Sequence, residues 1–140
     1  MHRLVAALAL ASSLFAGCAW AQSVDESVAQ LRTAFARAVY QHAGSLVHDE
    51  RPQPLLRAVV VLRVRLDEND HWQAEVFRDN PNQPLMTKAA LESVSRLPAA
   101  ADLTPQARAA LRGEGLIEAW LFQNDGRFAL KTLAKPQRGG

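Results

Sequence analysis

The most constraining feature of this 140-residue chain is an alternating apolar run near its middle, residues 58–66 (Ala-Val-Val-Val-Leu-Arg-Val-Arg-Leu). Successive side chains of a β-strand point to opposite faces of its sheet. The residues that would share one face are Val60, Leu62, Val64 and Leu66. The opposite face carries two valines followed by two arginines. The pattern therefore predicts a strand with one side buried in a core and a partly charged side in water.

Two hairpins are expected in the chain. Asp67–Asp70 forms a polar turn after the first strand, and residues 72–78 alternate again, which predicts a second strand. Farther along, Asn124-Asp125-Gly126 is typical of a hairpin turn, because these residue types tolerate positive φ angles. It predicts that residues 116–123 and 128–133 pair as two more strands.

An amphipathic helix is expected before the first strand. Between residues 24 and 43, apolar side chains recur at spacings of three and four, so they line one face of a helix. Ser23 and Glu26 fit a capping box at its start. Pro52 and Pro54 then interrupt regular structure. Residues 22–54 are accordingly interpreted as this helix and a short linker.

Two further helices separate the second and third strands. Residues 84–97 carry an apolar stripe at helical spacing, and Thr104-Pro105 resembles a helix start that leads to a stop at Gly113. The resulting order of elements predicts an α+β fold, with a small antiparallel sheet and helices packed on one of its faces. A right-handed crossover between strands two and three gives the strand order 2-1-3-4. We assign residues 55–135 to this domain and residues 136–140 to a flexible tail.

The N-terminus has the layout of a secretory signal peptide, which we assign to residues 1–21. A short polar start precedes the apolar run 4–15, and Ala19-Trp20-Ala21 provides a cleavage site. Cleavage there predicts a periplasmic protein. An alternative is lipidation at Cys18, although Phe15 replaces the usual leucine of the lipoprotein box. A third possibility is an uncleaved anchor, for which the run is short.

Little in the sequence indicates catalysis or a cofactor. The Gly-x-Ser-x-Gly motif of hydrolases and the glycine-rich phosphate-binding loops are missing from the sequence. His42 and His48, together with Asp49 and Glu50, form an imaginable metal-ligand set without a recognised spacing. The net charge is +2 and basic residues are scattered, so nucleic-acid binding is not expected. We therefore expect neither an enzyme nor a cofactor.

Residues 58–98 resemble the core of the TonB C-terminal domain, a periplasmic module that passes force to outer-membrane transporters. The resemblance lies in the order of an apolar strand, a turn, a second strand, a helix with Ala89-Ala90-Leu91 near its start, and Pro98 just past that helix. It implies that an extended peptide from a partner adds to a sheet edge. The family's partner-binding strand corresponds to residues 115–123. The predicted hairpin would fold the last strand over this edge, and a paired edge does not accept a peptide.

The expected function is that of a secreted, non-enzymatic TonB-like module that binds a periplasmic or outer-membrane protein segment, with a link to outer-membrane transport. Two alternatives stay open: an anchored energy transducer for TonB-dependent transport, and a small periplasmic metal-binding or hydrolytic protein. Membrane contact is expected only with lipidation at Cys18 or an uncleaved signal. The expected partner-binding residues at the sheet edges are Trp72, Ala74, Val76, Leu116, Glu118, Trp120, Phe122, Phe128 and Leu130. Apolar neighbours also favour a core position for both tryptophans.

Overall fold

The computed structural model describes residues 16–137, with side chains described from residue 27 onward. The predicted signal peptide lies largely outside these residues, as does the end of the tail. In chain order, the elements are the helix α1 (Ala16–Ala43), the 3-10 helix η1 (Gly44–Leu46), the strands β1 (Ala58–Leu66) and β2 (Trp72–Arg78), the helices α2 (Pro84–Ser95) and α3 (Pro105–Arg112), and the strands β3 (Leu116–Phe122) and β4 (Phe128–Leu130).

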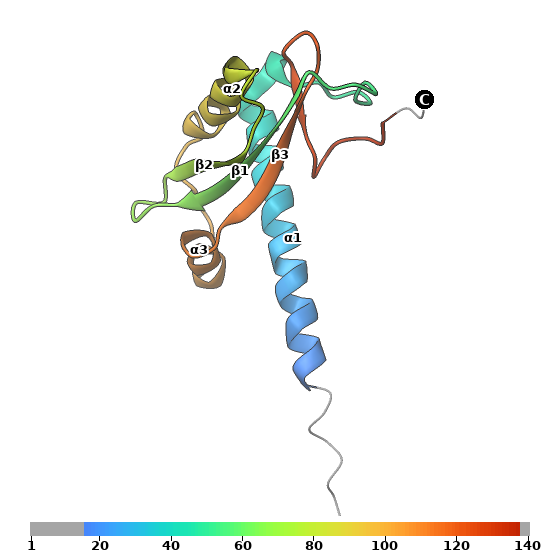
Figure 1. The fold of residues 1–140 in the computed structure, drawn as a ribbon. Coiled ribbons are helices and arrows are strands. Elements are labelled where there is room, and N and C mark those ends of the chain that lie inside the picture. Colours follow the sequence, from blue (N-terminus) through green and yellow to red (C-terminus); the bar gives the residue numbers. More distant parts are fainter. Residues whose placement is uncertain (1–15, 138–140) are drawn as a thin grey trace, which may run out of the picture.

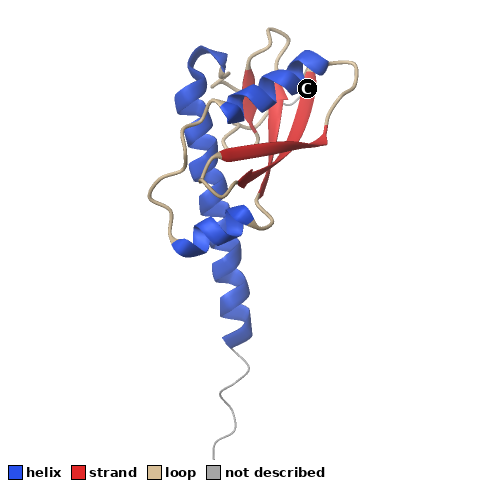
Figure 2. Cartoon of the chain, turned by 90° about the vertical axis from the view of Figure 1, so that its left-hand side faces the viewer, coloured by secondary structure: helices blue, strands red, loops and turns tan. Residues whose placement is uncertain are grey.

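The four strands form one antiparallel sheet in the order β2-β1-β3-β4, which confirms the predicted α+β class and strand order. Figure 1 shows the long helix α1 running across the sheet, with its first turns extending beyond the rest of the fold. In Figure 2, α2 crosses the strands near one end of the sheet and α3 lies near the other. The long central strands β1 and β3 thus hold the fold together, while β2 and β4 form its edges.

The core lies between the sheet and the helices. The alternate residues Val60, Leu62 and Val64 of β1 are fully buried, as their spacing predicted. Apolar side chains from the three α-helices complete this cluster, among them Phe35 and Val39 of α1, Ala90 and Val94 of α2, and Leu111 of α3. Each large apolar side chain removed from water contributes about 1.5–3 kcal/mol. Burial on this one face of the sheet therefore accounts for the placement of the helices.

Several element boundaries differ from the predictions, and the strand predicted over residues 116–123 ends one residue early, at Phe122. Helix α1 begins at Ala16, so Ser23 lies within the helix and does not cap it. Helix α2 ends at Ser95, two residues earlier than expected. The last strand was predicted to reach Leu133, but β4 ends at Leu130 because the Leu133 N–H bonds back to the Leu130 carbonyl in a turn. This early end of β4 leaves the first half of β3 without a strand on the side opposite β1.

The turn between β1 and β2 anchors α3. Asp70 adopts a left-handed conformation (φ 62°), and its carboxylate lies 2.8 Å from Arg112 Nη2 and 3.1 Å from Arg108 Nε. Arg112 also donates to the backbone carbonyls of Asp67 and Glu68. The Asp67 carboxylate accepts the N–H groups of His71 and Asn69, and these bonds lower the pKa of Asp67. The polar residues of this turn thus serve the fold.

Candidate functional site

The outer edge of β4 is closed by other parts of the chain. The Phe128 carbonyl accepts the His48 N–H at 2.7 Å, and the Leu130 N–H donates to the Tyr40 hydroxyl of α1 at 3.0 Å. Val47 also forms a bridge to Phe128. An edge whose backbone groups are already bonded offers no template for another strand. β4 is therefore not a docking edge.

The first half of β3, by contrast, has an open edge. β4 pairs only with Trp120, Leu121 and Phe122, and one more bond joins the Lys131 N–H to the Ala119 carbonyl at 2.9 Å. The N–H and C=O groups of successive residues in a strand point to alternate sides. Since the Ala119 carbonyl points to the β4 side, the N–H and C=O of Ile117 point to that side as well. Within residues 16–137, the N–H and C=O of Ile117 find no strand there. Ile117 therefore presents one unpaired donor and one unpaired acceptor.

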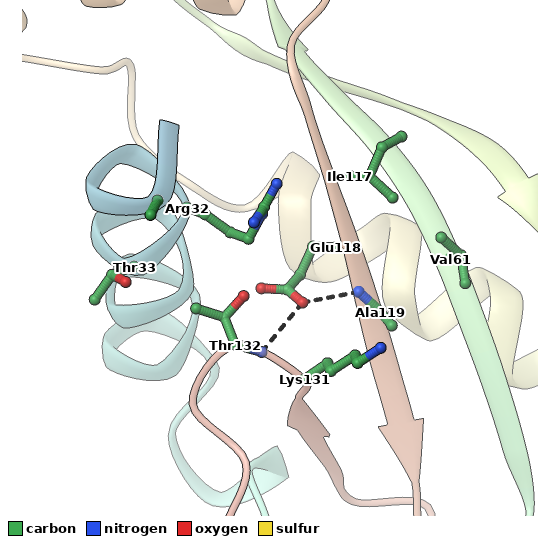
Figure 3. A pocket seen from close by; sticks show the side chains of 9 residues that line it. Arg32, Thr33, Val61, Ile117, Glu118, Ala119, Lys131 and Thr132 are labelled. Carbon is green, nitrogen blue, oxygen red and sulfur yellow. Dashed lines mark hydrogen bonds between the residues drawn. The ribbon is translucent and has the colours of Figure 1, made fainter. Parts of the chain in front are cut away.

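A groove of about 540 Å³ runs between this open edge and helix α1. Figure 3 shows its polar side chains, with Arg32 and Thr33 on the α1 side and Glu118, Lys131 and Thr132 on the sheet side. Its volume falls in the range of cavities that hold small ligands or peptide side chains. An open strand edge and a polar groove thus coincide at one place.

Glu118 lies at the centre of this groove, although β3 directs it to the core face opposite Leu62. The residue is only 3% exposed. The Oε1 atom accepts the Ala119 N–H at 2.9 Å and the Thr132 N–H at 3.4 Å, as Figure 3 shows. The Oε2 atom has no hydrogen-bond partner among the described residues, and neither has the buried Nε of Arg32.

The electrostatics of Glu118 follow from its position. Burial raises the pKa of this carboxyl. The side-chain hydroxyl of Thr132, the backbone N–H groups of Ala119 and Thr132, and the charge of Arg32 act in the opposite direction. Oε1 takes the place of a partner strand for the Ala119 N–H, so one oxygen has a structural role. The other oxygen remains able to accept a hydrogen bond from a ligand.

A second open edge belongs to β2. The Asp67 N–H bonds to the His71 carbonyl, so Trp72 and Ala74 of β2 direct their backbone groups away from β1. The Asp70 carbonyl at the start of this edge already accepts the Ala100 N–H. At the other end the register shifts opposite Val61 and Leu62, which marks a bulge near Phe77. Bulges and charges are devices that protect an edge from strand addition. The edge of β3 is thus the better template.

The side chains of the predicted edge residues divide into two groups. Those of Leu116, Trp120, Phe122, Phe128 and Leu130 are almost completely buried in the core. Of the β2 residues, Trp72 and Ala74 are half-buried, whereas Val76 is 43% exposed. Glu118 alone among the predicted residues lines the groove. Arg32 and Thr132 were not predicted, and Ile117 was included only as part of the strand at residues 115–123. A glutamate in the apolar phase of a strand is a signal that could have marked the site.

None of the histidines within residues 16–137 lines this groove. His42 is exposed and its Nδ1 lies 3.0 Å from the Ala38 carbonyl, while the backbone of His48 bonds to β4. Over the described part of the chain, no three His, Cys, Asp or Glu side chains gather in a way that could hold a metal ion. The helices within that same part also lack the combination of length and hydropathy that a membrane span requires.

No protein-family model matches this chain, and no curated protein and no solved structure matches it either. The contacts of the groove are therefore the basis on which a function is proposed.

Proposed function

We propose that this protein is a periplasmic, non-enzymatic TonB-like module that binds an extended segment of a periplasmic or outer-membrane protein by strand addition to β3. The observation that carries the proposal is the unpaired backbone of Ile117 at the rim of a 540 Å³ groove. Added strands gain affinity from backbone hydrogen bonds and selectivity from alternate side chains. Both requirements are available at this edge.

The position of the open edge agrees with the resemblance noted in the sequence. The strand that corresponds to the family's partner-binding strand is residues 115–123, and β4 covers only its second half. The hairpin at Asn124–Gly126 therefore leaves room for a partner beside Leu116–Glu118. A bound segment would lie in line with β4, under α1. Because few backbone bonds are available there, we expect a transient complex.

Proline substitutions test this proposal, since proline removes the N–H that an added strand needs. Ile117→Pro blocks the edge of β3, and Ala74→Pro blocks the outward N–H of β2 in the same way. Peptides would be selected from a phage-displayed library of random linear sequences on the protein purified from the periplasm. Binding would then be measured by titration and mapped on backbone amide signals.

We expect selected peptides to shift the amide signal of Ile117 and to lose about tenfold or more affinity with Ile117→Pro. The Ala74→Pro variant should bind them like the unaltered protein. Amide spectra of both variants establish that the sheet is intact. Loss of binding with Ala74→Pro alone would move the site to β2, and a library that gives no binding peptide would refute strand addition.

Export is tested separately by the intact mass of the protein recovered from the periplasm. Cleavage after Ala21 predicts a chain that begins at Gln22. A lipid-modified chain that begins at Cys18, or a chain that keeps its first residues and sediments with membranes, would replace this part of the proposal by the corresponding alternative.

A further inference from the structure

We propose that the groove beside β3 selects a segment with glutamine or asparagine opposite Glu118, an inference that rests on the proposed strand addition. The two groups that carry it are Glu118 Oε2 and Arg32 Nε, which are both buried and both without a hydrogen-bond partner in the described residues. They belong to the sheet side and the α1 side of the same groove.

Strand geometry decides which ligand side chain would meet these atoms. Residues directly opposite each other on adjacent strands place their side chains on the same face of the sheet. Glu118 points to the core face, toward α1. The ligand residue opposite Glu118 would therefore enter the groove between β3 and α1. Its neighbours in the ligand would point to the outer face and make no contact with Glu118.

The hydrogen-bonding requirement of the groove is a donor for Oε2 and an acceptor for the Arg32 N–H. Buried polar groups in proteins are nearly always hydrogen-bonded, so a ligand that satisfies both atoms is favoured. A primary carboxamide has two N–H donors and one carbonyl acceptor on a single planar group. The side chains of glutamine and asparagine thus supply both functions at once.

Charge excludes the other long polar side chains. A lysine or arginine of the ligand would approach Glu118 but would also be repelled by Arg32, and by Lys131 at the exposed rim. A glutamate would be repelled by Glu118 in a site with little water to screen the charge. An apolar side chain would leave both buried atoms unpaired. A neutral side chain with both a donor and an acceptor matches the groove best.

Single substitutions in the selected peptides test this selectivity. We expect those peptides to share a glutamine or asparagine at one position, and we expect its replacement by glutamate, lysine or leucine to weaken binding about tenfold or more. The Glu118→Gln variant reverses the polarity, since its carboxamide keeps an oxygen for Ala119 and presents an NH₂ group at the position of Oε2. This variant should prefer the glutamate peptide. Glu75→Gln, on the outer face of β2, is the control and should leave the ranking unchanged.

Each result separates the two proposals. Peptides that shift the Ile117 signal but tolerate every replacement, or that favour lysine or serine, would overturn carboxamide selection while strand addition stands. A glutamine preference that is unchanged in Glu118→Gln would also overturn it. Peptides that bind without affecting Ile117 would overturn both.

Discussion

The indole Nε1 of Trp120 donates a 2.9 Å hydrogen bond to the Oγ of Ser93, which joins the centre of β3 to helix α2. The Ser93 hydroxyl in turn donates to the Ala90 carbonyl at 2.7 Å. Both side chains are buried, with 0% and 8% of their surfaces exposed. A tryptophan N–H enclosed in an apolar core requires such a partner. The serine therefore allows the largest core side chain to sit under the helix.

We expect Ser93→Ala to lower the free energy of unfolding by about 1–3 kcal/mol, because the indole N–H would remain buried without a partner. Ser95→Ala is the matched control: Ser95 makes the same bond to the carbonyl three residues earlier, at 3.0 Å, but on an exposed position. Its effect should stay within about 0.5 kcal/mol. Urea unfolding measures both values, and equal losses would contradict this account of Trp120.

Gly115 is expected to be irreplaceable at the start of β3. Its φ is +72°, and a Cβ atom there would lie 2.2 Å from the Val64 carbonyl oxygen. Gly126 in the hairpin also has a positive φ, +87°, but a Cβ there meets no atom within 4 Å. Gly126→Ala should therefore cost about 1–2 kcal/mol, the strain of the left-handed conformation alone.

By comparison, Gly115→Ala should cost more than about 4 kcal/mol or prevent folding, because the backbone of β1 must move. Thermal unfolding followed by circular dichroism compares the two variants. A Gly115→Ala protein as stable as Gly126→Ala would show that the approach of Gly115 to β1 does not constrain this turn.

Tyr40 is expected to protect the edge of β4. Its hydroxyl accepts the Leu130 N–H at 3.0 Å, so Tyr40→Phe leaves that amide exposed at a strand edge. We expect faster hydrogen exchange at Leu130 and a loss of about 1 kcal/mol in stability. The Ala129 amide faces β3 and serves as an internal control, since its exchange should change only with the global loss. Equal acceleration at both amides would assign Tyr40 a packing role alone.

The first two strands could be predicted residue by residue, because the signals that define them are local in the sequence. The bounds of β1 and β2 follow from alternating side chains and from the polar turn at Asp67–Asp70, which need no distant contact. The end of β4 could not be predicted, because the Ala119 N–H is bonded to the side chain of Glu118 rather than to a strand. Here a side-chain oxygen replaces the backbone carbonyl of a neighbouring strand, and the strand propensities of the residues give no sign of such a replacement.

The groove was only partly accessible from the sequence for a similar reason. Arg32 and Glu118 are 86 positions apart in the sequence, and they line the same groove only because α1 packs on the sheet. The burial of Trp120 and Phe122 could be inferred, since they share the alternation of the apolar residues of β3. Glu118 has that same phase. Glu118 is therefore the part of the site that the sequence does reveal, because it is a charged residue at a strand position where the alternation predicts an apolar one.

Glu118 should make stability depend on pH in a distinctive direction. Burial raises the pKa of its carboxyl above the ordinary glutamate value of 4.5. Between the unfolded and the folded pKa, the folded protein therefore binds more protons at this group than the unfolded chain does. The free energy of unfolding must then fall as pH rises through this window. The lowered pKa values of Asp67 and Asp125 act in the opposite direction and below about pH 4.

Glu118→Gln isolates this contribution, because its carboxamide retains an oxygen for the Ala119 N–H and carries no charge. We expect the variant to be more stable than the unaltered protein above the window and to lose the downward slope within it, while the acid limb from the aspartates remains. Urea unfolding from about pH 2 to about pH 8 covers both the aspartate limb and the Glu118 window and measures the difference. Glu114→Gln, at an exposed glutamate before β3, should reproduce the unaltered curve. A Glu118→Gln curve that keeps the slope would mean that another group titrates in this window and that the carboxyl of Glu118 is well solvated. That result would also remove the buried acceptor on which the carboxamide proposal depends.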